Sequence, residues 1–348
     1  MTPPAAGVLP PAQQYLRRAV QAATKAPWVH NTQPWRFHIS PGQDQGSVEL
    51  FADRQRWLPV LDPTGRQLEF SCGAALLMLR VALRADGFDA AVTMLPGQDP
   101  DHLASVQVQP GADPTEQEQA LAGAIALRHS QRSPFSPRAV GAQALDELRR
   151  AAQAEGAWLS VVHRRDDQLA LTVLLARADR EESDNAAYRE ELASWLRTDP
   201  APDGIPVQVL PARGERHSEV TVRDFDLGRV AEAPQQQAGA PPVDEHPALV
   251  VLGTEGDGPA EHLLAGMALG RLLLQATTAG LAASSLGQVV DRPGPRAWLR
   301  RELNLVGDPQ MVLRLGYPAA PTDAATGRRP LEEVLRHEQP NHDRATGG

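Results

Sequence analysis

The 348-residue chain contains one cysteine, Cys72, and one lysine, Lys25. A single cysteine excludes an intrachain disulfide and any zinc cluster built from cysteines. Because Cys72 lies in an apolar run of helical character, we expect a buried structural thiol rather than a redox centre. The near absence of lysine leaves the positive charge almost entirely to arginine, which is the better bidentate ligand for a phosphate.

Long apolar runs and targeting segments are also lacking. No stretch of 18 apolar residues exists, so the sequence predicts no membrane-spanning helix. Residues 1–12 are rich in proline and alanine but have neither the basic region nor the apolar core of a signal peptide. The net charge of −9 argues against nucleic acid or anionic membranes as partners. We therefore expect a cytoplasmic protein that acts on a small-molecule substrate.

Several catalytic signatures are missing as well. There is no G-x-G-x-x-G fingerprint and no P-loop, which disfavours a dinucleotide bound in a Rossmann half and an ATPase. Ser284 and Ser285 lack the surroundings of a nucleophile elbow, which disfavours a hydrolase. The mixed polar clusters at 163–167 and 245–246 do not have the i, i+4 spacing of helical metal ligands, so we expect no metal site.

The hydrophobic periodicity predicts a series of helices and strands along the chain. We expect a flexible arm (1–12), a first half (13–115), a second half (116–336) and a disordered tail (337–348). The Pro-, Gly- and Gln-rich stretch of about 198–245 is too long for an ordinary connection, so we expect a lid, an excursion or disorder there. Helices are predicted at 13–25, 67–86, 115–126, 144–154, 166–178, 185–197, 259–279 and 293–303. Strands are predicted at 35–39, 47–51, 90–95, 103–108, 158–163, 247–252, 281–286 and 309–316.

Two of these helices resemble each other. Gly73 and Gly87 are 14 residues apart, and so are Gly266 and Gly280, with an offset of 193 residues between the two segments. A helix that is apolar nearly all round belongs at the centre of its layer. Chance similarity between two Leu/Ala-rich helices is the alternative explanation. Combined with the distribution of the motifs described next, the repeat favours a tandem duplication.

The most informative stretch is A-P-W-V-H-N-T-Q-P-W-R-F at residues 26–37. We expect Pro27 and Pro34 to hold it rigid and extended. Its amides and imidazole suit a flat polar heterocycle, although a turn followed by an edge strand explains the same residues. The pattern A-P-x-x-x-N-x-Q-P-W-x-F resembles the flavin loop of the nitroreductase superfamily. The sequence H-N-T-Q-P-W-R-F is similar to the motif of the Acg-like branch of that superfamily.

A second motif, R-H-S-Q-R, lies at residues 128–132. Arg128 and Ser130 are two residues apart and point the same way on an extended segment, where a guanidinium and a hydroxyl can share one phosphate. A solvated basic turn is the alternative for this motif taken alone. The motif resembles the family's Arg-x-Ser-x-Arg/Lys segment. That resemblance implies that His129 faces the ribityl hydroxyls and that Arg132 reaches the pyrimidine edge of the isoalloxazine.

In nitroreductase-like dimers one subunit supplies the Arg-x-Ser-x-Arg/Lys segment and the other supplies the N-x-Q-P-W loop. Here the first half carries only the loop and the second half only the arginine segment. The resemblance therefore implies a nitroreductase-like α+β fold of two tandem degenerate halves that form an intramolecular pseudo-dimer. We expect one FMN per chain, in a monomer that is itself the pseudo-dimer or in a weak homodimer.

The resemblance implies further flavin contacts from the second half. The backbone at Ser284, Ser285, Leu286 and Gly287 would lie against the ring, although a Ser/Gly turn is an equally good explanation. The C-terminal G-Y-P and R-R-P-L segments imply a second phosphate contact from Arg328 and Arg329 together. An exposed ion-paired arginine pair is the alternative.

Within the loop, the resemblance implies flavin contacts from Pro27, Trp28, Val29, Asn31 and Gln33. The family usually has a serine where Trp28 stands and often a second serine at Val29. An indole cannot hydrogen-bond the flavin carbonyls as a hydroxyl would. Trp28 could instead stack on or shield the isoalloxazine, or belong to the core.

The function that the resemblance implies is an FMN-dependent oxidoreductase. NAD(P)H would be the transient electron donor, and a nitro- or quinone-type acceptor would receive the electrons. No side chain is expected to act as a catalytic nucleophile, because the flavin carries the chemistry. The alternative is an FMN-sequestering or storage protein in which the stretch 198–245 closes over the flavin and turnover is low or absent.

Overall fold

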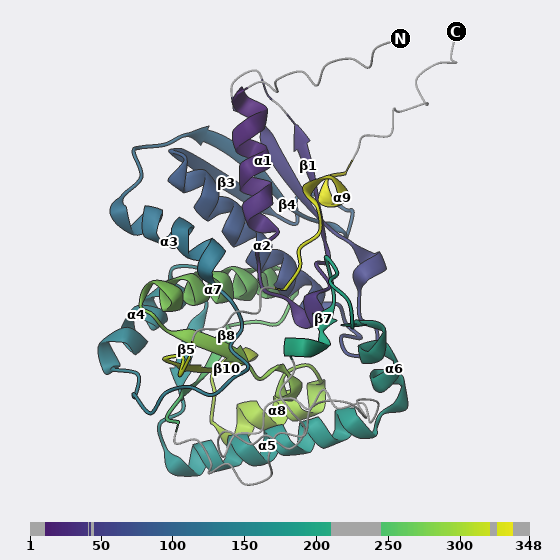
Figure 1. Cartoon of the computed structure of the whole chain (residues 1–348), viewed down its shortest axis with the longest axis vertical. Helices are drawn as coiled ribbons and strands as arrows, with labels where there is room; N and C mark the ends of the chain where they lie inside the picture. The colour runs from purple at the N-terminus through teal and green to yellow at the C-terminus, as the bar shows by residue number, and fades with distance from the viewer. Residues whose placement is uncertain (1–10, 41, 43–44, 210–244, 321–325, 337–348) are drawn as a thin grey trace.

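The computed structural model describes residues 11–40, 42, 45–209, 245–320 and 326–336. Its described strands form two four-stranded sheets, one above and one below α7 (Pro259–Thr278) in Figure 1. The first sheet has the spatial order β1 (Trp35–Ser40), β2 (Ser47–Ala52), β4 (His102–Pro110), β3 (Phe88–Met94). The second has the order β5 (Trp158–Val161), β8 (Ala248–Thr254), β10 (Asp308–Gly316), β9 (Ala282–Ser285).

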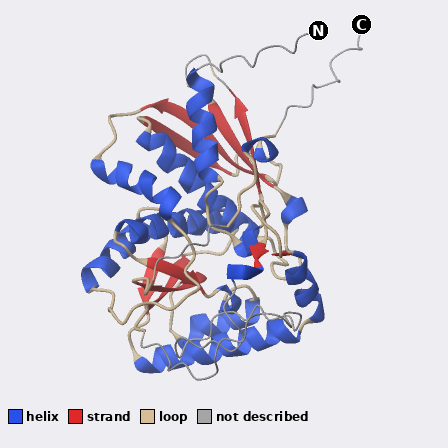
Figure 2. Cartoon of the chain, in the orientation of Figure 1, coloured by secondary structure: helices blue, strands red, loops and turns tan. Residues whose placement is uncertain are grey.

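The two sheets share one topology. Neighbouring strands are antiparallel throughout both sheets, and in each the strand that comes fourth in sequence lies between the second and the third. This repetition agrees with two halves of similar architecture. A short parallel pair, β6 (Leu196–Arg197) with β7 (Ile205–Pro206), stands apart from both sheets. Figure 2 shows the two groups of strands separated by helices.

Helices cover the second sheet on both faces. The strands β8 and β10 are buried almost without interruption, as expected for strands that lie between two layers. By contrast, β3 alternates between half-buried and exposed residues, so one face of the first sheet meets solvent. The remaining helices are α1 (Pro11–Ala23), α2 (Arg66–Ala85), α3 (Glu116–Leu127), α4 (Ala142–Gln153), α5 (Arg165–Asp184), α6 (Ala186–Ser194), α8 (Pro293–Glu302) and α9 (Leu331–Val334).

The two similar helices, α2 and α7, cross at glycines. A Cβ on Gly73 would lie 2.2 Å from the carbonyl oxygen of Leu263, and a Cβ on Gly266 would lie 1.9 Å from that of Phe70. The offset of 193 relates Gly73 to Gly266 and Phe70 to Leu263. The contacts are therefore reciprocal, as they are across a two-fold axis. The central position expected for both helices is confirmed.

The expected elements are found within a few residues of their predicted bounds, apart from α5, which runs six residues beyond its predicted end at 178 to Asp184, and the connection after α6. The predicted helix 185–197 ends at Ser194, and a short strand follows. Of the stretch 198–245, only 198–209 and 245 belong to the described residues, so the predicted lid lies mostly outside them, as do the arm and the tail. The half boundaries at 115/116 and 336/337 stay predictions. None of the described helices is long and apolar enough to cross a membrane.

Candidate functional site

The loop between α1 and β1 is coiled, so the expectation of an extended segment is wrong. Trp28 itself is extended, but Val29–Asn31 form a single 3-10 turn. His30, Asn31 and Gln33 have φ angles of 52°, 58° and 53°, in the left-handed region. The two prolines flank this turn without straightening it. Backbone strain of this kind is rare in non-glycine residues and concentrates at functional sites.

The side chain of Asn31 connects the loop to two distant segments. Its Nδ2 donates to the carbonyl oxygens of Gly204 at 2.8 Å and Gly327 at 3.3 Å. Its Oδ1 is buried and has no hydrogen-bond partner among the described residues. Asn31 therefore retains one free acceptor in the interior of the protein.

Gln33 and Arg329 bind each other and other protein groups. Gln33 Nε2 donates to the carbonyl of Pro202 at 2.7 Å, and its Oε1 accepts from the backbone N–H of Arg329 at 2.8 Å. The guanidinium of Arg329 lies 3.4 Å from the carboxylate of Asp53 and donates to the carbonyl of Glu333 at 2.8 Å. Arg329 thus has a carboxylate partner, which it shares with Arg36, 3.0 Å from the same carboxylate, whereas Arg328 has none among the described residues.

The R-H-S-Q-R segment lies beside β9, an edge strand of the second sheet. Ser130 forms an isolated parallel bridge with Ala283, and the N–H of Gln131 donates to the carbonyl of Ala283 at 2.8 Å. The next residue, Ser284, is buried, whereas Ser285 is exposed. The structure thus brings together the two predicted segments 128–132 and 284–287.

The backbone N–H of Leu286 is used within the protein. It donates to the carbonyl of Val312 at 2.8 Å, and the Leu286 side chain is fully buried. Gly287 begins the 3-10 turn Gly287–Val289, and its carbonyl accepts from the N–H groups of Val290 and Asp291. An N–H directed at a flavin would therefore have to come from a residue of the 284–287 stretch other than Leu286.

Four basic residues gather between the loop and the R-H-S-Q-R segment: Lys25, Arg128, Arg132 and Arg328. Burial and the charge of Arg132 lower the pKa of Arg128 to about 10. Burial and the charge of Arg128 lower the pKa of Arg328 to about 9. Burial lowers the pKa of Arg132, and burial with the charge of Arg328 lowers that of Lys25. The four residues form a chain of neighbouring like charges.

No carboxylate among the described residues neutralises this cluster. No acidic group contributes to the pKa of any of its four members. Arg128 donates to the carbonyl of Lys25 at 3.4 Å, and the Nε atoms of Arg128 and Arg328 are buried without partners. Arg128 is buried and the other three are half-buried, and cations withdrawn from water without a counter-ion are unfavourable. The arrangement therefore fits a bound anion, and a phosphate monoester matches its charge.

Other predicted site residues also present polar atoms without partners. Trp28 Nε1 and His129 Nε2 are buried and make no hydrogen bond in the described part of the chain. His129 Nδ1 donates to the carbonyl of Leu127 at 3.1 Å. His129 Nε2 and Asn31 Oδ1 suit a ligand that has polar groups beyond its phosphate.

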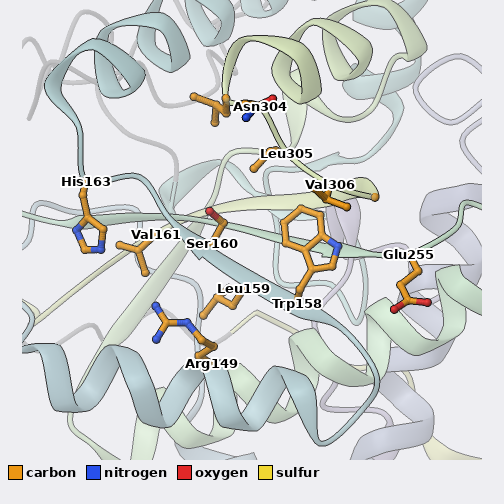
Figure 3. Close-up of a pocket in the computed structure, with 12 residues that line it drawn as sticks. Arg149, Trp158, Leu159, Ser160, Val161, His163, Glu255, Asn304, Leu305 and Val306 are labelled. Atoms are coloured by element: carbon orange, nitrogen blue, oxygen red, sulfur yellow. The ribbon is translucent and has the colours of Figure 1, made fainter.

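A separate cavity of about 790 Å³ opens along β5 (Figure 3). Trp158, Ser160 and Val161 line one side of it, and the turn at Asn304–Val306 lines another. None of the predicted site residues lines this cavity. Because β5 is the edge strand opposite β9, the cavity lies at the far edge of the sheet from the R-H-S-Q-R segment.

Sequence comparison identifies the family. The chain is 33% identical over 331 residues to "Putative NAD(P)H nitroreductase Rv3131" of Mycobacterium tuberculosis, which covers 93% of this chain and 92% of that protein. It is 31% identical over 333 residues to "Putative NAD(P)H nitroreductase acg" of the same organism, covering 94% and 97%. The chain belongs to the nitroreductase family, in its Acg-like branch. A scan of protein-family models finds no match.

The chain is also similar to a third relative and to two solved structures. "Uncharacterized protein Rv3127" of M. tuberculosis is 34% identical over 328 residues, which is 93% of either chain. Among solved structures, a "putative nitroreductase" from Anabaena variabilis is similar over 90% of both chains, with a TM-score of 0.49 and 12% identity. A "Nitroreductase with Bound FMN" from Bacteroides fragilis is similar over 65% of this chain and 98% of that one, with a TM-score of 0.34 and 16% identity.

Sequence reasoning missed Lys25 and the segment 202–204 as parts of this site. Lys25 was notable only as the lone lysine, although its place two residues before Pro27 is a signal that could have indicated a role. The segment 202–204 contacts the loop through backbone carbonyls and one N–H, which leave no pattern in the sequence.

Proposed function

We propose that this chain binds one FMN between its two halves and acts as an NAD(P)H-dependent oxidoreductase of the nitroreductase type. The observation that carries the proposal is the cluster of Lys25, Arg128, Arg132 and Arg328 without a carboxylate partner. Its members come from the loop side, the R-H-S-Q-R segment and the C-terminal segment. The relatives named as putative NAD(P)H nitroreductases support the proposed activity.

The phosphate would be held by Arg128 and Arg328, with the hydroxyl of Ser130 as a further donor. Both guanidinium groups retain a buried Nε without a partner, so each has a donor to offer. His129 would use its free Nε2 for the ribityl hydroxyls. Arg329, already paired with Asp53, would act through the loop by fixing Gln33.

The ring would lie between the loop and the 284–287 stretch. When bound, FMN supplies a ring that accepts a hydride from NAD(P)H and passes electrons to a nitro- or quinone-type acceptor. Arg132 would face the pyrimidine edge, where a fixed cation in a desolvated site stabilises developing negative charge. Asn31 Oδ1 would accept a hydrogen bond from a ring N–H. No side chain is assigned a nucleophilic role.

A second candidate function is storage or sequestration of FMN. Residues 202–204, at the start of the predicted lid, are fixed to the loop by Asn31 and Gln33. An ion pair between Arg56 and Asp203 adds to this attachment. Closure of a segment over the loop would restrict access of a nicotinamide to the ring. The rest of the predicted lid, 210–244, lies outside the described residues.

An anaerobic reduction experiment separates the two functions. The purified protein, loaded with FMN, is mixed with NADH and then with NADPH while the blue absorption band of the flavin is followed. Bleaching within seconds by either nucleotide supports the oxidoreductase. Bleaching by dithionite alone supports sequestration. A protein that takes up no added FMN overturns the site assignment and both functions.

The remaining assignments belong to the same proposal. We expect the pseudo-dimer of halves 13–115 and 116–336 to form the complete site within one chain, either as a monomer or in a weak homodimer. The substrates would be small molecules, and the location would be the cytoplasm. Sedimentation of the FMN-loaded protein at several concentrations tests whether one chain forms the complete site, because an obligate dimer would lose FMN on dilution.

A further inference from the structure

The guanidinium of Arg328 packs over the ring of Trp28. The Cζ of Arg328 lies 4.4 Å from the ring centroid, a distance at which an aromatic face attracts a cation. The Trp28 ring in turn meets the buried ring of Trp35 edge to face, with centroids 4.6 Å apart and an interplanar angle of 81°. Trp28 therefore connects the core of the first half to a cation from the C-terminal segment.

The other contacts of Arg328 hold only one end of its guanidinium. Its Nη1 donates to the carbonyl and hydroxyl of Thr326 at 2.9 and 2.6 Å and to the carbonyl of Gly327 at 2.8 Å. Its Nε is buried without a partner. The charge of Arg128 acts against that of Arg328, which is one cause of the lowered pKa of Arg328. A carboxylate beside Arg328 would neutralise its charge. An indole ring holds the guanidinium in place and leaves that charge available to an anion.

We propose that Trp28 is a positioning residue for the FMN phosphate: its ring fixes Arg328 beside Arg128 and so makes the site prefer FMN to riboflavin. This inference rests on the proposed function. It assigns to Trp28 a role different from the two that the sequence left open, because a stacking partner of the isoalloxazine would act equally on both flavins. A residue that only packs in the core would act on neither.

The experiment compares the dissociation constants of FMN and riboflavin, which share the ring and ribityl chain and differ in the phosphate. The variants are Trp28→Leu, Trp28→Phe and Arg328→Gln, each checked for an unchanged unfolding midpoint. We expect Trp28→Leu to weaken FMN binding about tenfold and to change riboflavin binding less than about twofold. Trp28→Phe should recover most of the loss, because phenylalanine retains an aromatic face for the cation.

The double variant W28L/R328Q tests whether the two residues act as a unit. If Trp28 acts through Arg328, the double variant binds FMN no more weakly than Arg328→Gln alone. Trp298→Leu is the matched control: Trp298 is also half-buried and also carries an arginine, Arg177, 3.9 Å from its ring centroid. This control should leave both affinities unchanged.

Three results would overturn the inference while leaving flavin binding intact. These are equal weakening of FMN and riboflavin by Trp28→Leu, no effect on either flavin, and a wild-type protein that binds riboflavin as tightly as FMN. A wild-type protein that binds neither flavin would overturn the proposed function itself, and the inference with it.

Discussion

Glu69 and His262 occupy equivalent positions in the two halves and hydrogen-bond to each other. The carboxylate Oε2 lies 2.7 Å from the imidazole Nδ1, and the two residues are 193 positions apart, the offset that relates α2 to α7. Residues that meet their own equivalents lie on the local two-fold axis. In a symmetric homodimer such a position would place two identical side chains together. The fused chain instead places an acid opposite a base, which only independent variation of the two halves allows.

Restoring chemical symmetry at this position should destabilise the protein. Both residues are buried, so His262→Glu would place two carboxylates in contact away from water. We expect a loss of about 3 kcal/mol in the free energy of unfolding, which urea denaturation measures. His163→Gln, at an exposed histidine, is the control and should change stability by less than about 0.5 kcal/mol. A His262→Glu protein as stable as the wild type would contradict the placement of this pair on the axis.

The crossing of α2 and α7 gives a second prediction. Gly266→Ala would place a methyl group 1.9 Å from the backbone oxygen of Phe70, and a backbone atom cannot move aside as a flexible side chain can. We expect the helices to separate and stability to fall by about 2 kcal/mol or more. Gly123→Ala, in α3 with nothing within 4 Å of the added Cβ, should instead stabilise by about 0.5–1 kcal/mol. Thermal unfolding of the two variants checks these opposite signs.

The basic cluster predicts how FMN binding responds to pH. The pKa values of Arg328, about 9, and Arg128, about 10, lie well below the ordinary value for an arginine. For bases with lowered pKa values, the cost of burying the charge is fully present below pH 9 and is relieved as the pH rises above these lowered values. A bound phosphate favours the charged forms. The stabilisation by FMN should therefore be largest below pH 9 and should decline above it.

The measurement is the shift in Tm caused by FMN at about pH 7.5 and about pH 10, with riboflavin as the control for titration of the ring. The FMN shift should shrink between the two pH values by more than the riboflavin shift does. If both flavins show the same pH dependence, the arginines do not hold the phosphate.

The sequence indicated two of the segments that form the candidate site. The loop at 26–37 and the R-H-S-Q-R segment could be found because each is a short run of unusual residues, and the repeat of α2 in α7 could be found because apolar periodicity survives in the sequence. What could not be predicted depends on contacts between remote positions. Gln33 meets Arg329, 296 residues away, and Asn31 meets Gly204, 173 residues away. The positive φ angle of Gln33 could not be predicted because glutamine is not among the residue types enriched in the left-handed region.

The different roles of Arg328 and Arg329 show the same limit. Adjacent arginines in one motif look equivalent, yet one faces Asp53 and the other faces Trp28 and Arg128. Their separation depends on where β1 and the loop place an acid and an indole. The R-R-P-L segment itself contains no pattern that distinguishes the two arginines.

Lys25 offers a test that uses its uniqueness in the chain. Burial and the charge of Arg328 lower its pKa, so a larger fraction of this amine is neutral near pH 8 than in an ordinary lysine. We expect a small amine-reactive reagent such as acetic anhydride to modify one side chain, Lys25, and FMN to protect it. Riboflavin, which lacks the phosphate, should protect it less. Mass spectrometry of the peptides after digestion separates the Lys25 adduct from any adduct at the N-terminal amine, whose labelling serves as the internal control. Equal protection by the two flavins would place Lys25 beside the ring or the ribityl chain instead of the phosphate, and labelling unaffected by FMN would remove it from the site.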